Sequence, residues 1–430
     1  MKQSKQQGLW LSIFLLAVSL SLTFFTGPAR LTGWAAGARI LTETEEPSEV
    51  LKLEEELPEA VTVMGAAGDN LPALSAIVID QQQGAVLFEK SPDDPLPPAS
   101  ITKVMTLLLT MEAIEQGRIG LEDVISASDY ACSMGGSQIW LKPGEQMTVE
   151  DLLKAVCIVS ANDASVALGE AVAGTNDAFI DMMNSRAQEL GMENTHFLNC
   201  TGLDEPGHVS TARDIAIMSR ELMRHTRITE YSTIWMDTLR DGATELVNTN
   251  RLVRFYGGTT GLKTGTTNGA GSCLSATAER DGMGLVAVVM GSPTSDQRFA
   301  AARSLLDWGF ANFATVPIPA IDDQLVPVRV LRGEAYEMKV TYTAPGALVV
   351  PKAQKDLLTQ RVTLAADVEA PIHTGQVLGQ VEVLLDGTVV QAYPLTAGMD
   401  IDKMELGTAF GRLLSALLAA QPAAPVALTA

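Results

Sequence analysis

The sequence AIVIDQQQGAVLFE at residues 76–89 decides the fold class. Two short apolar runs flank a polar turn that ends in Gly84, which predicts a β-hairpin. Helical patterns follow it, and strand patterns return later in the chain, before a last helix. Strands at both ends of a helical segment predict an α+β domain whose terminal strands share one antiparallel sheet. We expect helices at 100–115, 148–159, 163–172, 175–190, 211–224 and 295–310, and strands at 260–264, 271–278 and 284–290.

A change of pattern after residue 316 indicates a second domain. Residues 326–395 hold short alternating runs, and Asp386-Gly387 lies between two of them as a two-residue hairpin signal. The sequence therefore predicts a small all-β domain over 316–400, after a first domain over 73–315.

The tail at residues 401–430 carries apolar residues at helical spacing. In-plane membrane binding favours a strongly basic polar face, whereas Lys403 and Arg412 are the only basic residues of 403–420. The tail is a candidate for a weak membrane anchor, and a helix packed on its own domain or a frayed end is the alternative.

The N-terminus has the three-part order of a secretory signal. Two lysines precede an apolar run over residues 9–25, and small residues follow at 35–38. We predict a signal peptide over 1–38, with an uncleaved membrane anchor as the alternative, and an acidic, solvated linker over 39–72. The expected location is extracytoplasmic, in the cell envelope or at the outer face of the cytoplasmic membrane.

The composition of the chain disfavours some classes of partner and site. The chain has 30 basic and 51 acidic residues and a net charge of −21, which disfavours nucleic acid as a partner. Its four cysteines have no metal-binding spacing, and two of them, Cys157 and Cys273, lie in apolar runs. We interpret the cysteines as buried core residues and assign no disulfide.

Ser100 and Lys103 form the first candidate catalytic pair. The segment PPASITK at residues 97–103 opens a predicted helix, and positions i and i+3 share a helix face. A serine hydroxyl needs an adjacent base to become a nucleophile, and a lysine can be that base if its pKa is lowered. Alone, however, a Ser-x-x-Lys pair is weak evidence, because such pairs recur by chance.

Two further motifs strengthen the case. Ser160-Ala161-Asn162 lies between two predicted helices, where a turn can present a hydroxyl and an amide to a cleft. In the strand-like segment Lys263-Thr264-Gly265, the glycine permits a ligand to approach the backbone closely. A helix cap and a strand end are the ordinary interpretations of each motif alone, but the ordered set of three is much rarer.

These three motifs, in this order, resemble those of the penicillin-recognising serine enzymes. Over residues 72–400 the chain is similar to the low-molecular-mass penicillin-binding proteins, specifically the D-alanyl-D-alanine carboxypeptidases of peptidase family S11. This resemblance implies a β-lactamase/transpeptidase-like domain followed by a small all-β domain. Further matching segments are Leu141-Lys142-Pro143-Gly144, Asn194-Thr195-His196-Phe197, Thr201-Gly202-Leu203, Ser210-Thr211-Ala212-Arg213-Asp214 and Gly261-Leu262-Lys263-Thr264-Gly265.

The resemblance implies an acyl-transfer mechanism. Ser100 would attack the carbonyl of the penultimate D-alanine in a peptidoglycan stem peptide, and Lys103 would accept its proton. Ser160 would relay a proton to the departing D-alanine amine, while Asn162 would hold the substrate or the lysine. The backbone N–H groups of Ser100 and Thr266 would form the oxyanion hole. Water would then hydrolyse the acyl-enzyme.

The resemblance also implies how the terminal carboxylate of the substrate is held. Lys263 would supply positive charge, and Thr264 and Thr266 would donate hydrogen bonds to the carboxylate. Arg213 is a further candidate partner, because a guanidinium is always charged. No metal or cofactor is implied. The expected partners are peptidoglycan stem peptides, with β-lactam antibiotics as covalent inhibitors.

Other functions fit less well. A β-lactamase shares the three motifs, but one major class positions its deacylating water with a Glu-x-x-Leu-Asn segment, which does not occur between Asn162 and Lys263. A non-catalytic module that binds peptidoglycan would not need an activated nucleophile. A Ser-His-Asp hydrolase is disfavoured because the chain has no G-x-S-x-G motif.

Overall fold

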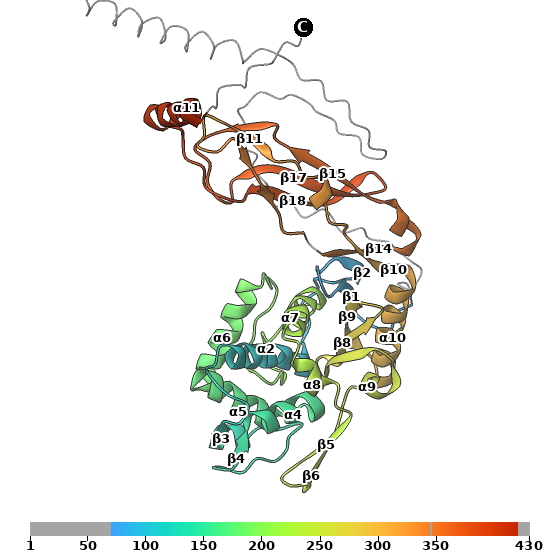
Figure 1. Ribbon diagram of the computed structural model, residues 1–430. Coiled ribbons are helices and arrows are strands. Elements are labelled where there is room, and N and C mark those ends of the chain that lie inside the picture. The colour runs from blue at the N-terminus through green and yellow to red at the C-terminus, as the bar shows by residue number, and fades with distance from the viewer. Residues whose placement is uncertain (1–69, 345, 420–430) are drawn as a thin grey trace, which may run out of the picture. The chain divides into compact units, whose positions relative to one another are not determined.

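The computed structural model describes residues 70–344 and 346–419 (Figure 1). The predicted signal peptide and nearly all of the predicted acidic linker lie in residues 1–69, outside the described residues.

A five-stranded antiparallel sheet organises the first domain. Its strand order is β2-β1-β9-β8-β7, so the N-terminal hairpin pairs with strands about 200 residues later, as the sequence predicted. Ile77 pairs with Val288 at the centre, and β7 forms one edge. The strands are β1 (Ser75–Asp80), β2 (Val86–Lys90), β7 (Thr259–Thr267), β8 (Gly271–Arg280) and β9 (Met283–Ser292).

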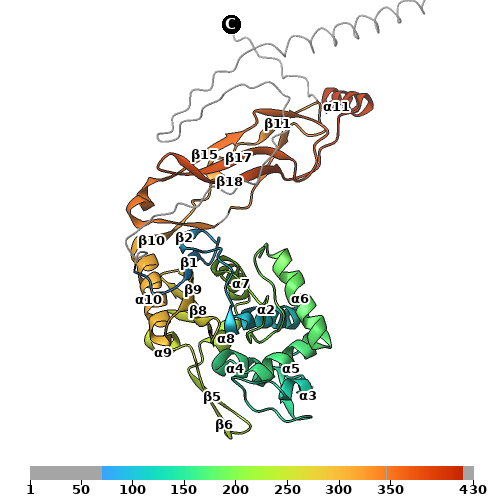
Figure 2. The same ribbon diagram turned by 180° about the vertical axis from the view of Figure 1, so that it is seen from behind.

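The two faces of this sheet contribute to two hydrophobic cores. Successive strand residues point to opposite faces, so Ile77 belongs to one core and Val78 to the other. Figures 1 and 2 show α10 (Ser295–Asn312) on one side of the sheet, with α2 (Lys103–Glu115) and α7 (Ala212–Arg224) on the other.

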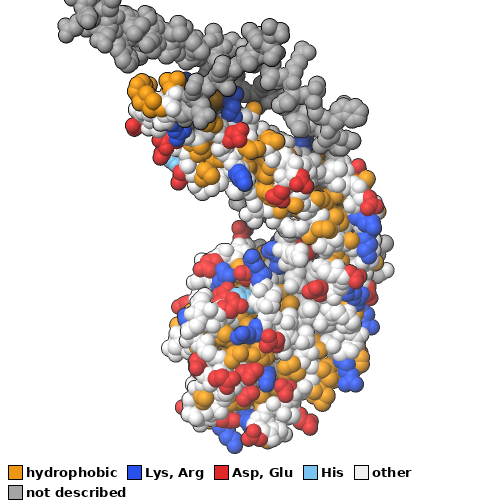
Figure 3. Space-filling view, viewed as in Figure 1, with side chains coloured by type: hydrophobic (Ala, Val, Ile, Leu, Met, Phe, Trp, Pro, Cys, Tyr) orange, Lys and Arg blue, Asp and Glu red, His pale blue; other side chains and the backbone are white. Residues whose placement is uncertain are grey.

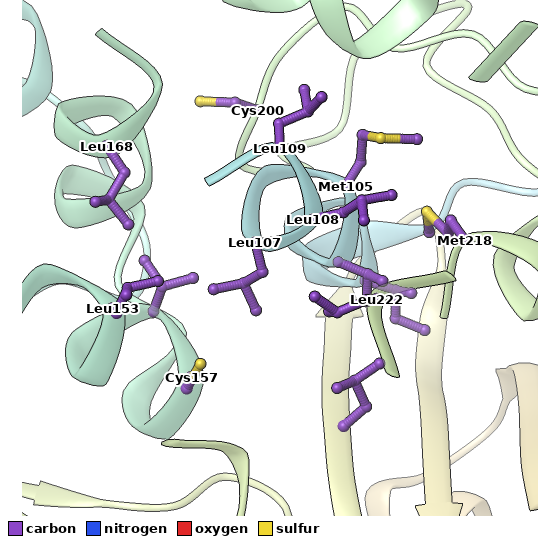
Figure 4. Close-up of a cluster of buried hydrophobic side chains, with 14 of the residues drawn as sticks. Met105, Leu107, Leu108, Leu109, Leu153, Cys157, Leu168, Cys200, Met218 and Leu222 are labelled. Carbon is purple, nitrogen blue, oxygen red and sulfur yellow. The ribbon is translucent and has the colours of Figure 1, made fainter. Parts of the chain in front are cut away.

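Helix α2 runs through the larger core. Its leucines and methionines are buried on all sides, which explains why its sequence is apolar around the whole helix. Figure 4 shows α2 between Leu153 and Leu168 on one side and Met218 and Leu222 on the other. The helices around it include α4 (Val149–Val159), α5 (Asn162–Ala173), α6 (Asn176–Glu189) and α8 (Ile228–Ser232), and the short helices are α3 (Asp129–Cys132) and α9 (Leu252–Phe255).

Two short antiparallel pairs of strands were not predicted from the sequence. They are β3 (Val124–Ser126) with β4 (Gln146–Thr148), and β5 (Met236–Leu239) with β6 (Thr244–Val247). Their strands have only three or four residues, too few for a clear alternating pattern.

The C-terminal part is built almost entirely of strands. Its largest sheet has the order β13-β18-β17-β15, and Leu385 pairs with Thr388 across the predicted Asp386-Gly387 turn. The strands are β10 (Phe313–Pro317), β11 (Val328–Leu331), β12 (Glu337–Met338), β13 (Val340–Thr341), β14 (Ala347–Pro351), β15 (Leu358–Leu364), β16 (Asp367–Glu369), β17 (Val377–Leu385) and β18 (Thr388–Ala397), with short 3-10 turns η2 (Asp322–Gln324) and η3 (Lys352–Leu357). The mixed α+β architecture with an all-β C-terminal domain is therefore as predicted.

Helix α11 (Leu406–Ala419) occupies the described part of the tail. It carries exposed large hydrophobic side chains, which Figure 3 shows gathered on its surface: Leu406, Phe410, Leu413, Leu414, Leu417 and Leu418. Among the described residues, no helix combines the length and apolar character that crossing a membrane requires.

Candidate active site

Ser100 lies in a 3-10 turn, η1 (Ala99–Thr102), just before α2 begins at Lys103. The sequence predicted a regular helix from residue 100. The difference arises at Ala99, whose φ of 50° is a left-handed value that costs a non-glycine residue about 1–3 kcal/mol unless its surroundings hold it.

Two glycines from distant segments hold this turn. A Cβ on Gly202 would lie 1.8 Å from the carbonyl oxygen of Ala99, and one on Gly265 would lie 3.0 Å from the backbone nitrogen of Ser100. We predicted that Gly265 leaves room for a ligand. In the structure it leaves room for η1, which brings the backbones of Ser100 and β7 together.

Lys103 is the centre of the site. Its side chain is fully buried, and Nζ lies 3.0 Å from Ser100 Oγ, 2.6 Å from Asn162 Oδ1 and 2.6 Å from the carbonyl oxygen of Thr201. Asn162 Nδ2 donates to the carbonyl oxygen of Gly135, which orients the amide so that its oxygen faces the lysine.

The electrostatics shift Lys103 toward its neutral amine. Burial lowers the pKa of Lys103 well below its ordinary value, and the nearby positive charge of Lys263 lowers this pKa further. A neutral amine has two N–H donors and one lone pair. Because the oxygens of Asn162 and Thr201 can only accept, they take the two donors, and the lone pair is left for the hydroxyl of Ser100.

Ser160 lies at the junction of α4 and α5. It ends α4 in the left-handed conformation, with a φ of 64°, and Asn162 begins α5 two residues later. The Ser160 Oγ is buried and has no hydrogen-bond partner among the described residues. Buried hydroxyls are nearly always paired, so this one is available to a reacting group.

Lys263 lies on the edge strand β7 and is also fully buried. Its Nζ donates to the carbonyl oxygen of Thr264 at 3.0 Å. Burial lowers the pKa of Lys263 to about 7, and the charge of Arg298 contributes in the same direction. This amine therefore changes its charge near neutral pH.

Thr264 and Thr266 follow Lys263 on β7, and the second contacts an arginine that the sequence did not reveal. Arg298 of α10 lies with Nη1 2.7 Å from Thr266 Oγ1 and 2.8 Å from the carbonyl oxygen of Gly265. Thr264 Oγ1 instead donates to Thr249 Oγ1 at 2.8 Å. Arg298 belongs to none of the sequence motifs. It reaches β7 because the fold places α10 against the sheet that contains this strand.

The structure places Arg213, the arginine predicted from the sequence, away from these groups. Its Nε lies 2.7 Å from Asp93 Oδ1, and its Nη2 lies 3.0 Å from Glu89 Oε2. The guanidinium is thus paired with two carboxylates of its own domain. Among the described residues, Arg298 rather than Arg213 is the arginine that contacts β7 at the Lys-Thr-Gly motif.

The four cysteines are free thiols. Burial raises the pKa of Cys157 to about 12 and that of Cys273 to about 11, so these thiols stay protonated and unreactive. The described residues also contain no group of three or more His, Cys, Asp or Glu side chains that could hold a metal ion.

Two family models match the chain. Residues 62–294 match the family model for D-alanyl-D-alanine carboxypeptidase, Peptidase_S11, and residues 313–403 match that for the penicillin-binding protein 5 C-terminal domain.

Two characterised relatives carry the same description. D-alanyl-D-alanine carboxypeptidase DacF of Bacillus subtilis is 40% identical over 335 residues, which is 77% of this chain and 86% of the relative. D-alanyl-D-alanine carboxypeptidase DacC of Escherichia coli is 36% identical over 80% of this chain and 87% of its own length.

Solved structures show the same similarity. Penicillin-binding protein 5 of Haemophilus influenzae has a TM-score of 0.71 at 32% identity, covering 79% of this chain and all of that one. Penicillin-binding protein D2 of Listeria monocytogenes in its ampicillin-bound form has a TM-score of 0.52 at 32% identity, covering 56% of this chain and 98% of its own.

These matches do not fit a β-lactamase or a non-catalytic binding module. They support a serine hydrolase that acts on peptidoglycan and binds penicillin. The chain belongs to the D-alanyl-D-alanine carboxypeptidases of peptidase family S11.

Proposed function

We propose that Ser100 and Lys103 are the nucleophile and general base with which this carboxypeptidase removes the terminal D-alanine from peptidoglycan stem pentapeptides. The three contacts of Lys103 carry the proposal. Two acceptors take the N–H groups of its neutral amine, and the third neighbour, 3.0 Å away, is the hydroxyl of Ser100.

In the acylation step, Ser100 Oγ forms a bond to the carbonyl carbon of the penultimate D-alanine as its proton passes to Lys103 Nζ. Negative charge develops on the carbonyl oxygen, where the N–H groups of Ser100 and Thr266 would donate to it. Donors aimed at developing charge typically contribute about 10²–10³ in rate each. The approach of η1 to Gly265 supports this pairing of donors.

The peptide C–N bond then breaks, and the departing amine needs a proton. We assign this transfer to Ser160, whose buried hydroxyl has no partner among the described residues. Ser160 would give its proton to the amine and take up the proton that Lys103 accepted from Ser100, which returns Lys103 to its neutral form. Asn162 holds Lys103 in place through its oriented amide. Water then attacks the acyl-enzyme, with Lys103 again as the base, and releases the shortened peptide.

The terminal carboxylate of the substrate would bind at β7. Lys263 supplies positive charge, and Gly265 lets β7 approach Ser100. The hydroxyls of Thr264 and Thr266, which in this structure donate to Thr249 Oγ1 and to the carbonyl oxygen of Gly265, would turn to donate to the carboxylate. Arg298 adds a cation beside Thr266. We place Arg213 outside this group because its guanidinium is paired with Asp93 and Glu89.

A single substitution tests the nucleophile. Ser100→Ala should abolish both D-alanine release from a peptide ending in D-Ala-D-Ala and formation of a covalent adduct with a fluorescent penicillin. Ser185→Ala is a matched control, because the hydroxyl of this exposed serine donates to the carbonyl oxygen of Asp181 within α6. Release at the normal rate by Ser100→Ala would refute the assignment.

We also propose export. Sequencing the N-terminus of the protein recovered outside the cytoplasm should show cleavage near Ala36 or Ala38. Recovery of a chain that still begins at Met1 would instead favour the uncleaved anchor. The proposed boundaries after cleavage are a linker to residue 72, a catalytic domain over 73–315 and a β domain over 316–400.

Peripheral membrane association through the tail is a further part of the proposal. The exposed large hydrophobic side chains of α11 support it, whereas the scarcity of basic residues there limits attraction to anionic lipids. The test is co-sedimentation with phosphatidylglycerol vesicles of the mature chain with and without residues 401–430. Equal sedimentation of the two chains would exclude the tail as the anchor.

A further inference from the structure

A loop from a distant part of the sequence contacts the turn that carries Ser100 and Lys103. Residues 198–208 form this loop, which we call the bracing loop. Two isolated β-bridges hold its base, Leu96 with Ser210 and His196 with Val209. The loop touches the turn at Gly202, which packs on the carbonyl of Ala99, and at Thr201, whose carbonyl accepts from Lys103.

His208 makes the third contact, through its side chain. Its Nε2 lies 2.8 Å from Thr102 Oγ1, and both side chains are buried. At the other edge of the ring, the backbone N–H of Leu198 donates to Nδ1 at 3.0 Å. The ring therefore joins one end of the bracing loop to the residue that directly precedes Lys103.

The hydrogen bonds define the tautomer and the charge of the His208 ring. Because the N–H of Leu198 donates to Nδ1, the proton of the neutral imidazole lies on Nε2, which donates to Thr102. Burial lowers the pKa of His208 to about 4, so the neutral form persists at neutral pH. A charged ring could not accept from Leu198.

Thr102 is a sensitive point of the turn. It lies between Ser100 and Lys103, three residues after the strained Ala99. Strained backbone persists only where its surroundings hold it, and a misplacement of about 1 Å in a reacting group can cost about 10²-fold in rate. A buried side-chain hydrogen bond to Thr102 limits such a displacement.

We propose that His208 is a positioning residue for acyl transfer, which acts through Thr102 to keep Ser100 Oγ and Lys103 Nζ within proton-transfer distance. The proposal rests on the roles proposed above for Ser100 and Lys103. His208 itself contacts neither of the two reacting atoms.

Two conservative variants test the hydrogen bonds of the two ring nitrogens separately. The amide of glutamine reaches about as far as Nε2, and that of asparagine about as far as Nδ1. His208→Gln should keep the bond to Thr102 and acylate with fluorescent penicillin within about threefold of wild type. His208→Asn should keep the bond to Leu198 and lose about 10- to 100-fold in acylation rate, with little change in KM for D-alanine release. Equal acylation by the two variants would overturn the proposal.

Variants of Thr102 test the same bond from its other side. Thr102→Val should reproduce the loss, and Thr102→Ser should restore most of the rate. In the Thr102→Val background, His208→Asn should cause no further loss, whereas independent, additive losses would contradict the proposal. The non-additivity of the two losses remains measurable even if one single variant is partly unfolded. Each rate is divided by the folded fraction of that variant, which a thermal unfolding curve gives.

Two controls complete the design. His225→Gln removes a histidine whose Nδ1 lies 2.9 Å from Glu115 at the far end of α2, and it should leave acylation unchanged. Ser100→Ala distinguishes the two hypotheses. Normal turnover in that variant overturns the proposed function, whereas full activity in His208→Asn together with an inactive Ser100→Ala overturns only the role of His208.

Discussion

Between Ser75 and Arg298 the chain buries many polar side chains, among them Lys103, Asn162 and Lys263, whereas the buried side chains described between residues 313 and 418 are all hydrophobic. Both parts have well-formed hydrophobic cores, so the difference does not come from a shortage of apolar residues. We attribute the difference to the catalytic role proposed for the first part.

Burying an amine is unfavourable unless its hydrogen bonds are satisfied. Lys103 has three polar partners within 3.0 Å, while among the described residues Lys263 donates only to the carbonyl of Thr264. Among its described residues, the C-terminal β domain buries no amine and therefore has no such loss of stability. From this comparison we propose that the first domain gives up stability for a lowered lysine pKa, and three experiments test this proposal.

The largest expected effect is on Lys103. Lys103→Met keeps a long side chain and removes the amine, so acylation by fluorescent penicillin should fall by about 10²–10⁴-fold, the usual contribution of a general base. Stopped-flow fluorescence measures the rate. Lys355→Met in the β domain is the matched control, because Lys355 is exposed. Wild-type acylation by Lys103→Met would remove the basis of the comparison.

A smaller effect on rate, together with a gain in stability, is expected at Lys263. Lys263→Met should lower kcat/KM for D-alanine release by about 10- to 100-fold, the loss of a charged hydrogen bond to the substrate. In the wild type, substrate binding should weaken as the pH rises through about 7, because the Lys263 amine loses its proton there.

The stability of the same variant depends on pH with a definite sign. The pKa of Lys263 is about 7 when folded, and that of an unfolded lysine is about 10.4. Between these values the unfolded chain binds more protons, so folding stability rises with pH, and the penalty is largest below pH 7. Thermal unfolding should therefore show a greater gain from Lys263→Met at pH 6 than at pH 9. An equal gain at both pH values would contradict the assigned pKa.

No effect on acylation is expected from the C-terminal core. Leu395→Ala removes a fully buried side chain and should lower the unfolding free energy of that part by about 2–5 kcal/mol. Urea unfolding of the full chain measures the loss, and exposed Leu357→Ala is the control. Slower acylation by folded Leu395→Ala would show that the two parts are coupled.

The fold was largely predictable from local patterns. The hairpin at residues 76–89, the late strands and the Asp386-Gly387 turn were all placed correctly, because alternation and turn residues are local properties. The 3-10 turn at Ser100 was not predicted, because its backbone is held by Gly202 and Gly265, which are more than 100 residues away.

The candidate site also has features that were predictable from the sequence and features that were not. The sequence by itself determined the three motifs, their order and the family, because those depend on residue types at short spacing. Only the tertiary structure decided that the carbonyl of Thr201 and the amide of Asn162 accept from Lys103, that Arg298 rather than Arg213 contacts β7, and that His208 holds Thr102. Burial and hydrogen bonds between residues far apart in the chain set these features. Neither can be read from a local segment.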